Sequence, residues 1–353
     1  MRNPVIEEDL RFIRGARLPW RRFEGKSILI SGANGFLPAY MAETILYLNE
    51  TLLRRKAKVY AMVRDLKRAK KRFGHYAGRP DLVFIVQDVC KPLSIKGGLH
   101  YIIHAASHSS PKRFGKDPAG TIAANTVGTR NLLELARAKR SEGFLFFSSA
   151  EIYGDIPARK MPIGEDMGGY LDPAAVRSCY AEGKRAGEAM CACWNRQYGV
   201  PAKIVRPFHT YGPGMKLDDG RVYADFISDV VHSRDIVIRG NGAARRTFCY
   251  LADATAGFFT VLLKGKNGNA YNISDEKGEM SVSELARMLT EIFPEKKLSI
   301  KYDRAPGRES YMKSEIARAH PRITRIRKLG WAPRYSPEEG FRRTIGSFLW
   351  PTD

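Results

Sequence analysis

The sequence predicts an α/β fold: a doubly wound parallel sheet with a smaller C-terminal cap. Short, continuously apolar runs alternate with helix-like segments over residues 26–206. This alternation is typical of parallel strands whose connecting helices cover both faces of a sheet. After Arg206 the pattern loosens into loops rich in Gly, Pro and Asp, which indicates a cap beside the sheet. A chain of 353 residues with 44% hydrophobic composition can bury a core of this size.

The apolar runs and their flanking residues place the individual elements. Strands are predicted at 27–31, 58–63, 82–86, 100–105, 144–148 and 202–206. Helices are predicted at 38–53, 66–72, 121–140, 179–198 and 337–349. Asn3 and Pro4, followed by acidic residues, are typical of a helix start. We expect residues 1–24 to form a basic N-terminal arm, and the core to begin at Lys26.

Composition narrows the possible partners and compartments. The formal net charge is +22, but the basic residues are spread along the chain without a nucleic-acid-binding motif, so we expect no nucleic-acid partner. The apolar runs are shorter than the roughly 20 residues that cross a bilayer, and neither a secretory nor a mitochondrial signal fits the N-terminus, so we expect a cytoplasmic protein without a membrane span. Five scattered cysteines without a CxxC pair predict neither a disulfide framework nor a metal site.

A glycine-bearing turn follows the first predicted strand, in the sequence Ile-Leu-Ile-Ser-Gly-Ala-Asn-Gly-Phe-Leu-Pro over residues 28–38. Glycines there let the backbone approach a pyrophosphate, and the amides at the following helix start favour its negative charge. Pro38 replaces a third glycine, which is tolerable because an amide in the first turn has no intrahelical partner. The turn predicts a dinucleotide site with contacts from Gly32, Asn34, Gly35, Phe36 and Leu37. We therefore assign 25–206 to dinucleotide binding and 207–353 mainly to substrate binding, with segments near 246–262 returning to the first domain.

The residues after the second and third predicted strands, where we expect the adenosine, do not point to one cofactor. An acid after the second strand selects NAD, but here Val63 is followed by Arg64 and then Asp65. Arg64 would accept a 2′-phosphate, whereas Asp65 would reach the ribose hydroxyls of NAD. Asp88 and Val89 follow the third strand, where we expect the adenine. We expect NAD as the cofactor, with NADP as the alternative because of Arg64.

A tyrosine and a lysine four residues apart form the candidate catalytic pair. Tyr180 and Lys184 fall on one face of the predicted helix 179–198. A free tyrosine titrates near pH ~10, so a nearby ammonium and a positively charged nicotinamide must lower its pKa before it can act as a base. The segment Ser-Ser-Ala-Glu at 148–151 ends the strand that precedes this helix, and it supplies Ser149 and Glu151 as further candidates.

Together these motifs resemble the extended short-chain dehydrogenase/reductase family, also described as NAD-dependent epimerases and dehydratases with a Rossmann sheet. The resemblance runs in order from about Lys26 to Leu349, through the segments 32–38, 104–106, 125–129, 148–151, 180–184, 206–213, 271–274 and 329–331. Segments 177–185, 218–222 and 246–250 are most similar to UDP-glucuronate decarboxylases, also called UDP-xylose synthases. The next most similar group is the dTDP-glucose 4,6-dehydratases.

The resemblance implies roles for individual residues. Tyr180 would take the proton from the sugar 4-hydroxyl, Ser149 would hydrogen-bond that oxygen, and Glu151 matches an acid found in decarboxylases and dehydratases. Lys184 would hold the nicotinamide ribose. Further cofactor contacts are implied for His104, Ala105, Ala106, Asn125 and Arg206. Contacts with a nucleotide-sugar, most similar to a UDP-linked one, are implied for Ser107, Arg177, His209, Arg221, Arg246 and Arg308.

Ala150 departs from the family pattern in an informative way. Dehydratases have an aspartate there to protonate the departing 6-hydroxyl, and decarboxylases usually have a serine. A 4-keto uronic acid is a β-keto acid that loses CO2 without a leaving-group acid, so decarboxylation tolerates alanine, as does C4 epimerisation. We expect a UDP-glucuronate decarboxylase-like enzyme, with C4 epimerase or 4,6-dehydratase as alternatives. A non-catalytic basic binding protein that retains the fold is the alternative of another class.

Two further departures leave the nucleotide and the sugar open. His209 stands where relatives have an asparagine, and Asp225 stands where an asparagine contacts the nucleotide. The resemblance also implies a homodimer in which two helices from each subunit form a four-helix bundle. The matching segments are 121–140 and 179–198.

Overall fold

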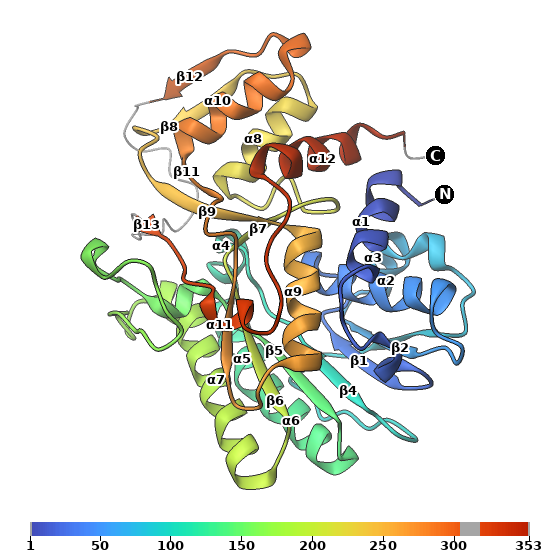
Figure 1. Ribbon diagram of the computed structural model, residues 1–353. Helices are drawn as coiled ribbons and strands as arrows, with labels where there is room; N and C mark the ends of the chain where they lie inside the picture. The colour runs from blue at the N-terminus through green and yellow to red at the C-terminus, as the bar shows by residue number, and fades with distance from the viewer. Residues whose placement is uncertain (1, 304–317, 352–353) are drawn as a thin grey trace.

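A parallel seven-stranded sheet forms the centre of the larger part of the protein (Figure 1). The computed structural model describes residues 2–303 and 318–351. The strand order is β10-β6-β5-β4-β1-β2-β3, and every neighbouring pair is parallel. The strands are β1 (Ser27–Ser31), β2 (Lys58–Val63), β3 (Leu82–Val86), β4 (Tyr101–His104), β5 (Gly143–Phe147), β6 (Ala202–Pro207) and β10 (Ala270–Ile273). The predicted fold class, a doubly wound α/β sheet, is confirmed.

Helices cover both faces of this sheet. One face packs against α2 (Phe36–Thr51), α3 (Leu66–Arg72) and α9 (Leu251–Lys264), and the other against α5 (Pro118–Asn125), α6 (Val127–Lys139) and α7 (Cys179–Tyr198). The single helix predicted at 121–140 is instead two helices that meet at Thr126. The first begins earlier because Asp117 caps it through the amide of Gly120 and Pro118 occupies its first turn. No helix within residues 2–303 and 318–351 is long and apolar enough to span a membrane.

The cap consists of smaller sheets and helices at the carboxyl side of the large sheet (Figure 1). Its elements are β7 (His209–Tyr211), α8 (Val222–Val231), β8 (Ile236–Arg239), β9 (Arg245–Tyr250), β11 (Glu279–Ser281), α10 (Val282–Ile292), β12 (Ile300–Asp303), β13 (Arg318–Ala319) and α12 (Pro337–Leu349). Two short helices, α4 (Pro111–Phe114) and α11 (Thr324–Arg327), are also present. We expected the chain to return to the first domain near 246–262. In the structure β9 belongs to a cap sheet, whereas α9 packs on the large sheet and β10 is one of its strands.

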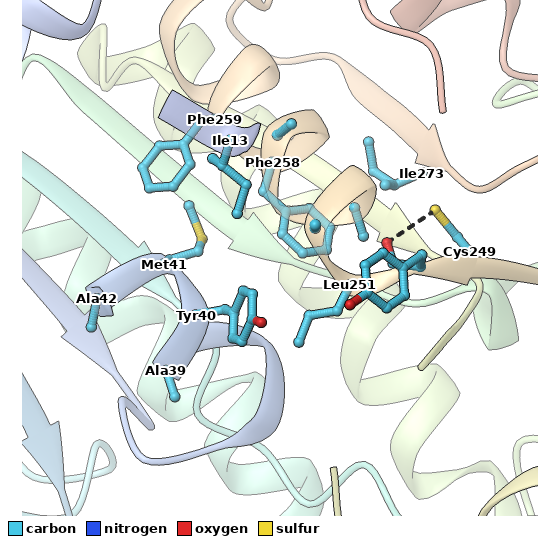
Figure 2. Close-up of a cluster of buried hydrophobic side chains, with 14 of the residues drawn as sticks. Ile13, Ala39, Tyr40, Met41, Ala42, Cys249, Leu251, Phe258, Phe259 and Ile273 are labelled. Atoms are coloured by element: carbon cyan, nitrogen blue, oxygen red, sulfur yellow. Dashed lines mark hydrogen bonds between the residues drawn. The ribbon is translucent and has the colours of Figure 1, made fainter. Parts of the chain in front are cut away.

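The N-terminal segment is part of the core rather than an arm outside it. Helix α1 (Pro4–Arg14) packs against α9, α2 and α12, and Leu10 and Ile13 are fully buried. Figure 2 shows Ile13 beside Phe259, on the side of the α9 helix that also faces Met41 of α2. Helix α1 is amphipathic, and its buried side carries Leu10 and Ile13 together with Asp9.

A buried carboxylate joins α1 to three other elements. Asp9 is fully buried and accepts hydrogen bonds from the hydroxyls of Tyr40 (2.8 Å) and Tyr250 (2.7 Å). Its other oxygen accepts from Nη2 of Arg343 on α12 at 2.7 Å. Burial raises the pKa of Asp9, while Arg343 and the two hydrogen bonds from tyrosines act in the opposite direction. The carboxylate therefore connects the N-terminus, the large sheet's helices and the cap.

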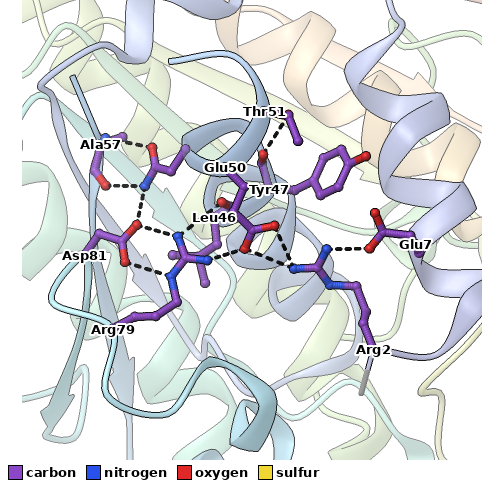
Figure 3. Close-up of polar contacts among 10 residues, drawn as sticks. Arg2, Glu7, Leu46, Tyr47, Glu50, Thr51, Ala57, Arg79 and Asp81 are labelled. Atoms are coloured by element: carbon purple, nitrogen blue, oxygen red, sulfur yellow. Dashed lines mark hydrogen bonds and ion pairs between the residues drawn. The ribbon is translucent and has the colours of Figure 1, made fainter. Parts of the chain in front are cut away.

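A second ion-pair network anchors the start of α1 (Figure 3). Arg2 lies between Glu7 and Glu50, and its Nη2 is 3.1 Å from the carboxylate of Glu50. Arg79 also pairs with Glu50, and its Nη2 lies 2.6 Å from Oδ2 of Asp81. These partly buried pairs hold α1 against α2 and the loop before β3.

We predict that Asp9→Ala lowers the free energy of unfolding by about 3 kcal/mol, because it leaves two buried tyrosine hydroxyls without their acceptor and removes the buried partner of Arg343. Urea unfolding followed by tryptophan fluorescence measures this change. Glu8→Ala is the matched control: Glu8 pairs with the same Arg343 at 2.9 Å, but its side chain is 58% exposed. We expect the control to lose less than about 1 kcal/mol. Equal losses in the two variants would contradict the assigned role of Asp9.

Candidate active site

A cleft of about 810 Å³ opens at the carboxyl ends of the parallel strands, between the large sheet and the cap. It is lined by the turn after β1, by residues that follow β2, β3, β4 and β5, by the start of α7, and by cap residues between 207 and 223. In doubly wound sheets this edge is where ligands bind. The fold therefore gathers the motifs that the sequence singled out into one cavity.

The turn after β1 has the shape that a dinucleotide pyrophosphate requires. Gly32 has a φ of +66°, and a Cβ there would lie only 2.9 Å from Cα of Ala106. Helix α2 begins at Phe36 with Gly35 as its N-cap, and no side chain caps it. Its first-turn amides consequently remain available to an anion in the cleft, which Asn34 and Leu37 also line. These residues fit the nicotinamide cofactor that the sequence predicts.

The candidate catalytic residues meet at the other end of the same cleft. Tyr180 and Lys184 both line it, and Nζ of Lys184 lies 5.7 Å from the centroid of the Tyr180 ring. Ser149, which follows β5, hydrogen-bonds the phenol of Tyr180. The same hydroxyl accepts the amide of Glu151 at 3.2 Å, so its own proton can be donated to the phenol oxygen. Helix α7 and the end of β5 thus place a phenol, a hydroxyl and an ammonium side by side.

The electrostatic environment of Tyr180 combines burial with nearby charges. The pKa of Tyr180 is raised to about 12, first by burial and then by the Glu151 carboxylate, whereas Ser149, Arg221 and Arg177 act in the opposite direction. Nη1 of Arg177 donates to Oε2 of Glu151 at 2.8 Å, which keeps the carboxylate paired. In this structure the ammonium of Lys184 is directed to the carbonyl oxygen of Phe147, at 2.5 Å. The cations that act most on the phenol are therefore the two arginines.

Lys184 itself lies in a strongly desolvated position. Its side chain is 2% exposed, and burial lowers the pKa of its ammonium to about 7, although the Glu188 carboxylate acts in the opposite direction. The ammonium of Lys184 therefore loses its proton near neutral pH.

Most of the predicted cofactor residues line the cleft. Arg64 and Asp65 follow β2, and Asp88 and Val89 follow β3, at the end of the cleft away from Tyr180. The remaining lining residues of the predicted cofactor set are Gly32, Asn34, Gly35, Phe36, Leu37, Ala105, Ala106 and Lys184.

Three predicted cofactor residues are placed behind the cleft wall. His104 is fully buried and hydrogen-bonds Ser31 at 2.8 Å. Asn125 packs against Gly183 of α7, and its side-chain amide donates to Thr121 within α5. Arg206 differs most from the expectation: it pairs with Glu188 at 2.6 Å on the far side of β6. Side chains alternate along a strand, so Pro207 rather than Arg206 faces the cleft.

The predicted substrate residues divide in the same way. Ser107, His209 and Arg221 line the cleft. Arg177 and Arg246 do not line it: Arg177 pairs with Glu151, and the charge of Arg246 contributes to lowering the pKa of His209. Burial is the larger cause of that shift, which takes the His209 pKa to about 3. Arg308 lies outside the described residues.

Sequence reasoning missed several residues of the cleft and one that is buried beside it. The fully buried ring of Phe114 does not line the cleft but stacks on Tyr180, with centroids 5.5 Å apart and planes 9° from parallel. It belongs to the short helix α4, which carries no periodic signal. Other missed lining residues are mostly basic or polar and come from α3, α4 and α8 as well as from loops; they include Arg68, His108, Arg113, Lys116, Lys216 and Tyr223. Their basic character was visible in the sequence, but only the folded chain directs them to one cavity.

Residues 28–274 match the model of the NAD dependent epimerase/dehydratase family, which spans both the glycine turn and the tyrosine-lysine pair. The chain belongs to this family. The family predicted from the sequence motifs, that of extended short-chain dehydrogenases/reductases, is therefore confirmed.

Individual members of the family are similar to this chain over nearly its whole length. UDP-glucuronic acid decarboxylase 3 of Arabidopsis thaliana is 32% identical over 314 residues, which cover 89% of this chain and 86% of that protein. The Bacillus cereus UDP-glucuronic acid 4-epimerase, solved with UDP-glucuronic acid and NAD, has a TM-score of 0.74 at 20% identity and covers 91% of this chain and 98% of its own. The Bacillus anthracis dTDP-glucose 4,6-dehydratase, solved with NAD, has a TM-score of 0.73 at 18% identity, with coverage of 92% and 96%.

Membership in the epimerase/dehydratase family makes this chain a nicotinamide-dependent enzyme of nucleotide-sugar modification. The residues that the cleft brings together, from the glycine turn to Tyr180, are those that carried the family resemblance in the sequence. Family membership leaves the reaction itself among epimerisation, dehydration and decarboxylation.

The lowered pKa of Lys184 predicts a pH-dependent stability of the cofactor-free protein. The unfolded lysine keeps its proton to about pH 10, whereas the folded one loses it near pH 7. Stability should therefore rise as the pH increases from 7 towards 10, because the unfolded state binds more protons in that window. Relative to Lys184→Met, the wild type should gain about 2 kcal/mol between pH 7 and pH 9 in urea unfolding.

Lys70→Met is the control for this measurement, because Lys70 is exposed on α3. We expect it to track the wild type at both pH values. If Lys184→Met and the wild type kept a constant difference in stability from pH 7 to pH 9, the desolvated state of this ammonium would be refuted.

Proposed function

We propose that the protein decarboxylates a nucleotide-linked uronic acid, with UDP-glucuronate as the substrate to test first. The observation that carries the proposal is the group formed by Tyr180, Ser149 and Lys184 in a cleft whose other end has a pyrophosphate-binding turn. The similarity of 32% to a UDP-glucuronic acid decarboxylase over 89% of the chain supports this reaction among those of the family.

The side chains around Tyr180 have distinct parts in the proposed reaction. A bound nicotinamide would accept hydride from C4 of the sugar and return it at the end of the cycle. Tyr180 takes the proton of the 4-hydroxyl, Ser149 donates a hydrogen bond to the same oxygen, and Arg221 and Arg177 stabilise the phenolate. Because the pKa of Lys184 is about 7, its side chain is protonated in part of the molecules near neutral pH. It can therefore take up or release a proton during the reaction.

The 4-keto uronic acid that results from oxidation can break its own C5–C6 bond. The carboxylate leaves as CO2, the bonding electrons move to the 4-carbonyl oxygen as an enolate, and Tyr180 is placed to protonate or hydrogen-bond that oxygen. C5 then takes a proton and the 4-ketone is reduced. The sum is one uronic acid and one proton converted into one pentose and CO2, with the cofactor unchanged.

The absence of an acid at position 150 favours this reaction over dehydration. Ala150 lines the cleft between Ser149 and Glu151, and its methyl group cannot protonate a departing 6-hydroxyl. Glu151 is paired with Arg177 at 2.8 Å, so its carboxylate is already engaged by a guanidinium. Epimerisation at C4 needs no such acid and is the second candidate.

Incubation with UDP-glucuronate tests the proposal. We expect release of CO2 and a UDP-pentose identified by mass spectrometry, and Tyr180→Phe should lower the rate about 10²- to 10⁴-fold because the proton acceptor is lost. Tyr170→Phe is the matched control, since that side chain is 73% exposed and should leave the rate unchanged.

The other outcomes identify the alternatives. A product of unchanged mass is epimerisation, and a product lighter by one water is dehydration; either would replace decarboxylation. If a nicotinamide stays bound but no nucleotide-sugar of a panel reacts, and nucleic acid binds with a steep salt dependence, a non-catalytic basic protein would be the better description.

We further propose a homodimer formed through α5, α6 and α7. These helices cover the face of the large sheet opposite to α9. Ile122 of α5 and Val127 of α6 expose 40% and 46% of their surface, and exposed apolar side chains on packed helices are typical of an interface.

Sedimentation equilibrium at micromolar concentration tests the dimer. We expect the wild type to sediment as a dimer, and the double variant Ile122→Glu, Val127→Glu to sediment as a monomer because it places charges in an apolar contact. Tyr302→Glu, at a half-exposed position on β12 of the cap, should leave the dimer intact. A monomeric wild type would refute the interface.

A further inference from the structure

A second cavity, of about 520 Å³, lies at the amino ends of the parallel strands, the edge of the large sheet opposite to the cleft. Tyr101 at the start of β4, Glu142 just before β5 and Lys203 near the start of β6 line it. The end of α9 and the segment after α1 also line it, through Leu263 and Pro19. Its lining residues are all different from those of the cleft, so the proposed reaction uses none of them.

Lys203 places a buried ammonium at this cavity without a carboxylate to balance it. Its side chain is 6% exposed, and its Nζ lies 3.4 Å from the carbonyl oxygen of Pro201, which is longer than the usual range for such a hydrogen bond. The pKa of Lys203 is lowered to about 8, first by burial and then by the charge of Arg22, and no carboxylate of the described residues acts in the opposite direction.

Two further cations line the cavity, and main-chain carbonyls accept their hydrogen bonds. Nη1 of Arg22 donates to the carbonyl oxygen of Leu263 at 3.0 Å, and Nζ of Lys264 donates to that of Arg17 at 2.8 Å. Cations are favourable at the carboxyl end of a helix, which explains Arg22 and Lys264 at the end of α9. The same reason does not explain Lys203, because its contact is with the loop before β6.

The acid that lines the cavity is already engaged. Glu142 pairs with Lys26 at 2.6 Å, and its other oxygen accepts the hydroxyl of Tyr101 at 3.2 Å. A neighbouring cavity of about 340 Å³ shares Glu142, Tyr101 and Arg22 with the first, and it is also lined by Arg55. Positive charge therefore exceeds negative charge across both cavities.

An anion bound among these cations would offset the cost of burying the ammonium of Lys203. Ammonium and guanidinium groups form their strongest hydrogen bonds with carboxylate and phosphate oxygens, and a phosphate dianion balances two cations at once. The cavity has the size of a site for a small organic molecule rather than for a single ion. Pro19, Leu262 and Leu263 supply apolar surface for the organic part.

We propose that this cavity is a second ligand site, in which Lys203, Arg22 and Lys264 bind the phosphate group of a small phosphate monoester. The inference goes beyond the proposed function and does not depend on which reaction takes place in the cleft.

Equilibrium dialysis with radiolabelled glycerol 3-phosphate and with radiolabelled inorganic phosphate tests the site. The full chain is used at constant ionic strength, with NAD and UDP present to occupy the cleft. We expect both probes to bind, and the monoester to bind at least as tightly as inorganic phosphate because its carbon atoms contact the apolar wall. Lys203→Met should weaken both by at least about tenfold, since a buried charge-assisted hydrogen bond is lost.

Two further variants make the test specific. Lys266→Met removes a positive charge from an exposed residue of the same segment that does not line the cavity, and it should change the affinities by less than about twofold. Arg22→Gln keeps an amide that can donate to the carbonyl of Leu263 and removes the charge. It should weaken both probes as well, and it provides an independent test if Lys203→Met does not fold.

Three results would overturn the proposal: affinities that neither Lys203→Met nor Arg22→Gln changes, equal weakening by Lys266→Met, or binding of inorganic phosphate without the monoester. Failure of the proposed function has a different signature. A protein that converts no nucleotide-sugar, but loses glycerol 3-phosphate on Lys203→Met, retains the second site. A protein that converts UDP-glucuronate but binds neither probe retains the reaction and loses the second site.

Discussion

The buried contact between the ends of β1 and β4 is the constraint on which the site depends. The hydroxyl of Ser31 accepts hydrogen bonds from the backbone amides of Ala105 and Ala106, at 3.1 and 3.2 Å. The same hydroxyl is hydrogen-bonded to Nδ1 of His104. Backbone amides that are partly buried need an acceptor, and the serine hydroxyl supplies it to both of them. With the two strand ends joined, the glycine turn is held against Ala106, and it can admit no side chain at Gly32.

From that floor the cleft combines two opposite demands. Binding an anionic dinucleotide requires free amides and cations, whereas proton transfer at an alcohol requires a buried phenol and a desolvated ammonium. Burial raises the pKa of Tyr180 to about 12 and lowers that of Lys184 to about 7, and both changes oppose the charged forms. In the free protein, burial of these two groups lowers the free energy of unfolding. The charges of bound ligands shift their pKa values towards the forms that the reaction needs.

Stability lost at the cleft is offset by packing at a distance from it. Helix α1 contributes Leu10 and Ile13 to the core, and Asp9 connects α2, β9 and α12 through two tyrosines and Arg343. The buried hydrogen bonds of Asp9 thus connect the cap to the helices of the large sheet. The chain segments before and after α9 connect the same two parts.

The sequence alone determined the sheet, the glycine turn and the tyrosine-lysine pair, because these depend on local signals: apolar runs, turn residues and a spacing of four on a helix. It also showed the family, through motifs that follow one another in order. Only the tertiary structure decided which side chains reach the cleft. Arg206 turns away because strand residues alternate, Phe114 reaches Tyr180 from a helix too short to have a periodic pattern, and basic residues far apart in the chain converge at one rim. The N-terminal helix joined the core for the same reason: its apolar stripe needs a partner surface, and that surface exists only once α2, α9 and α12 have packed.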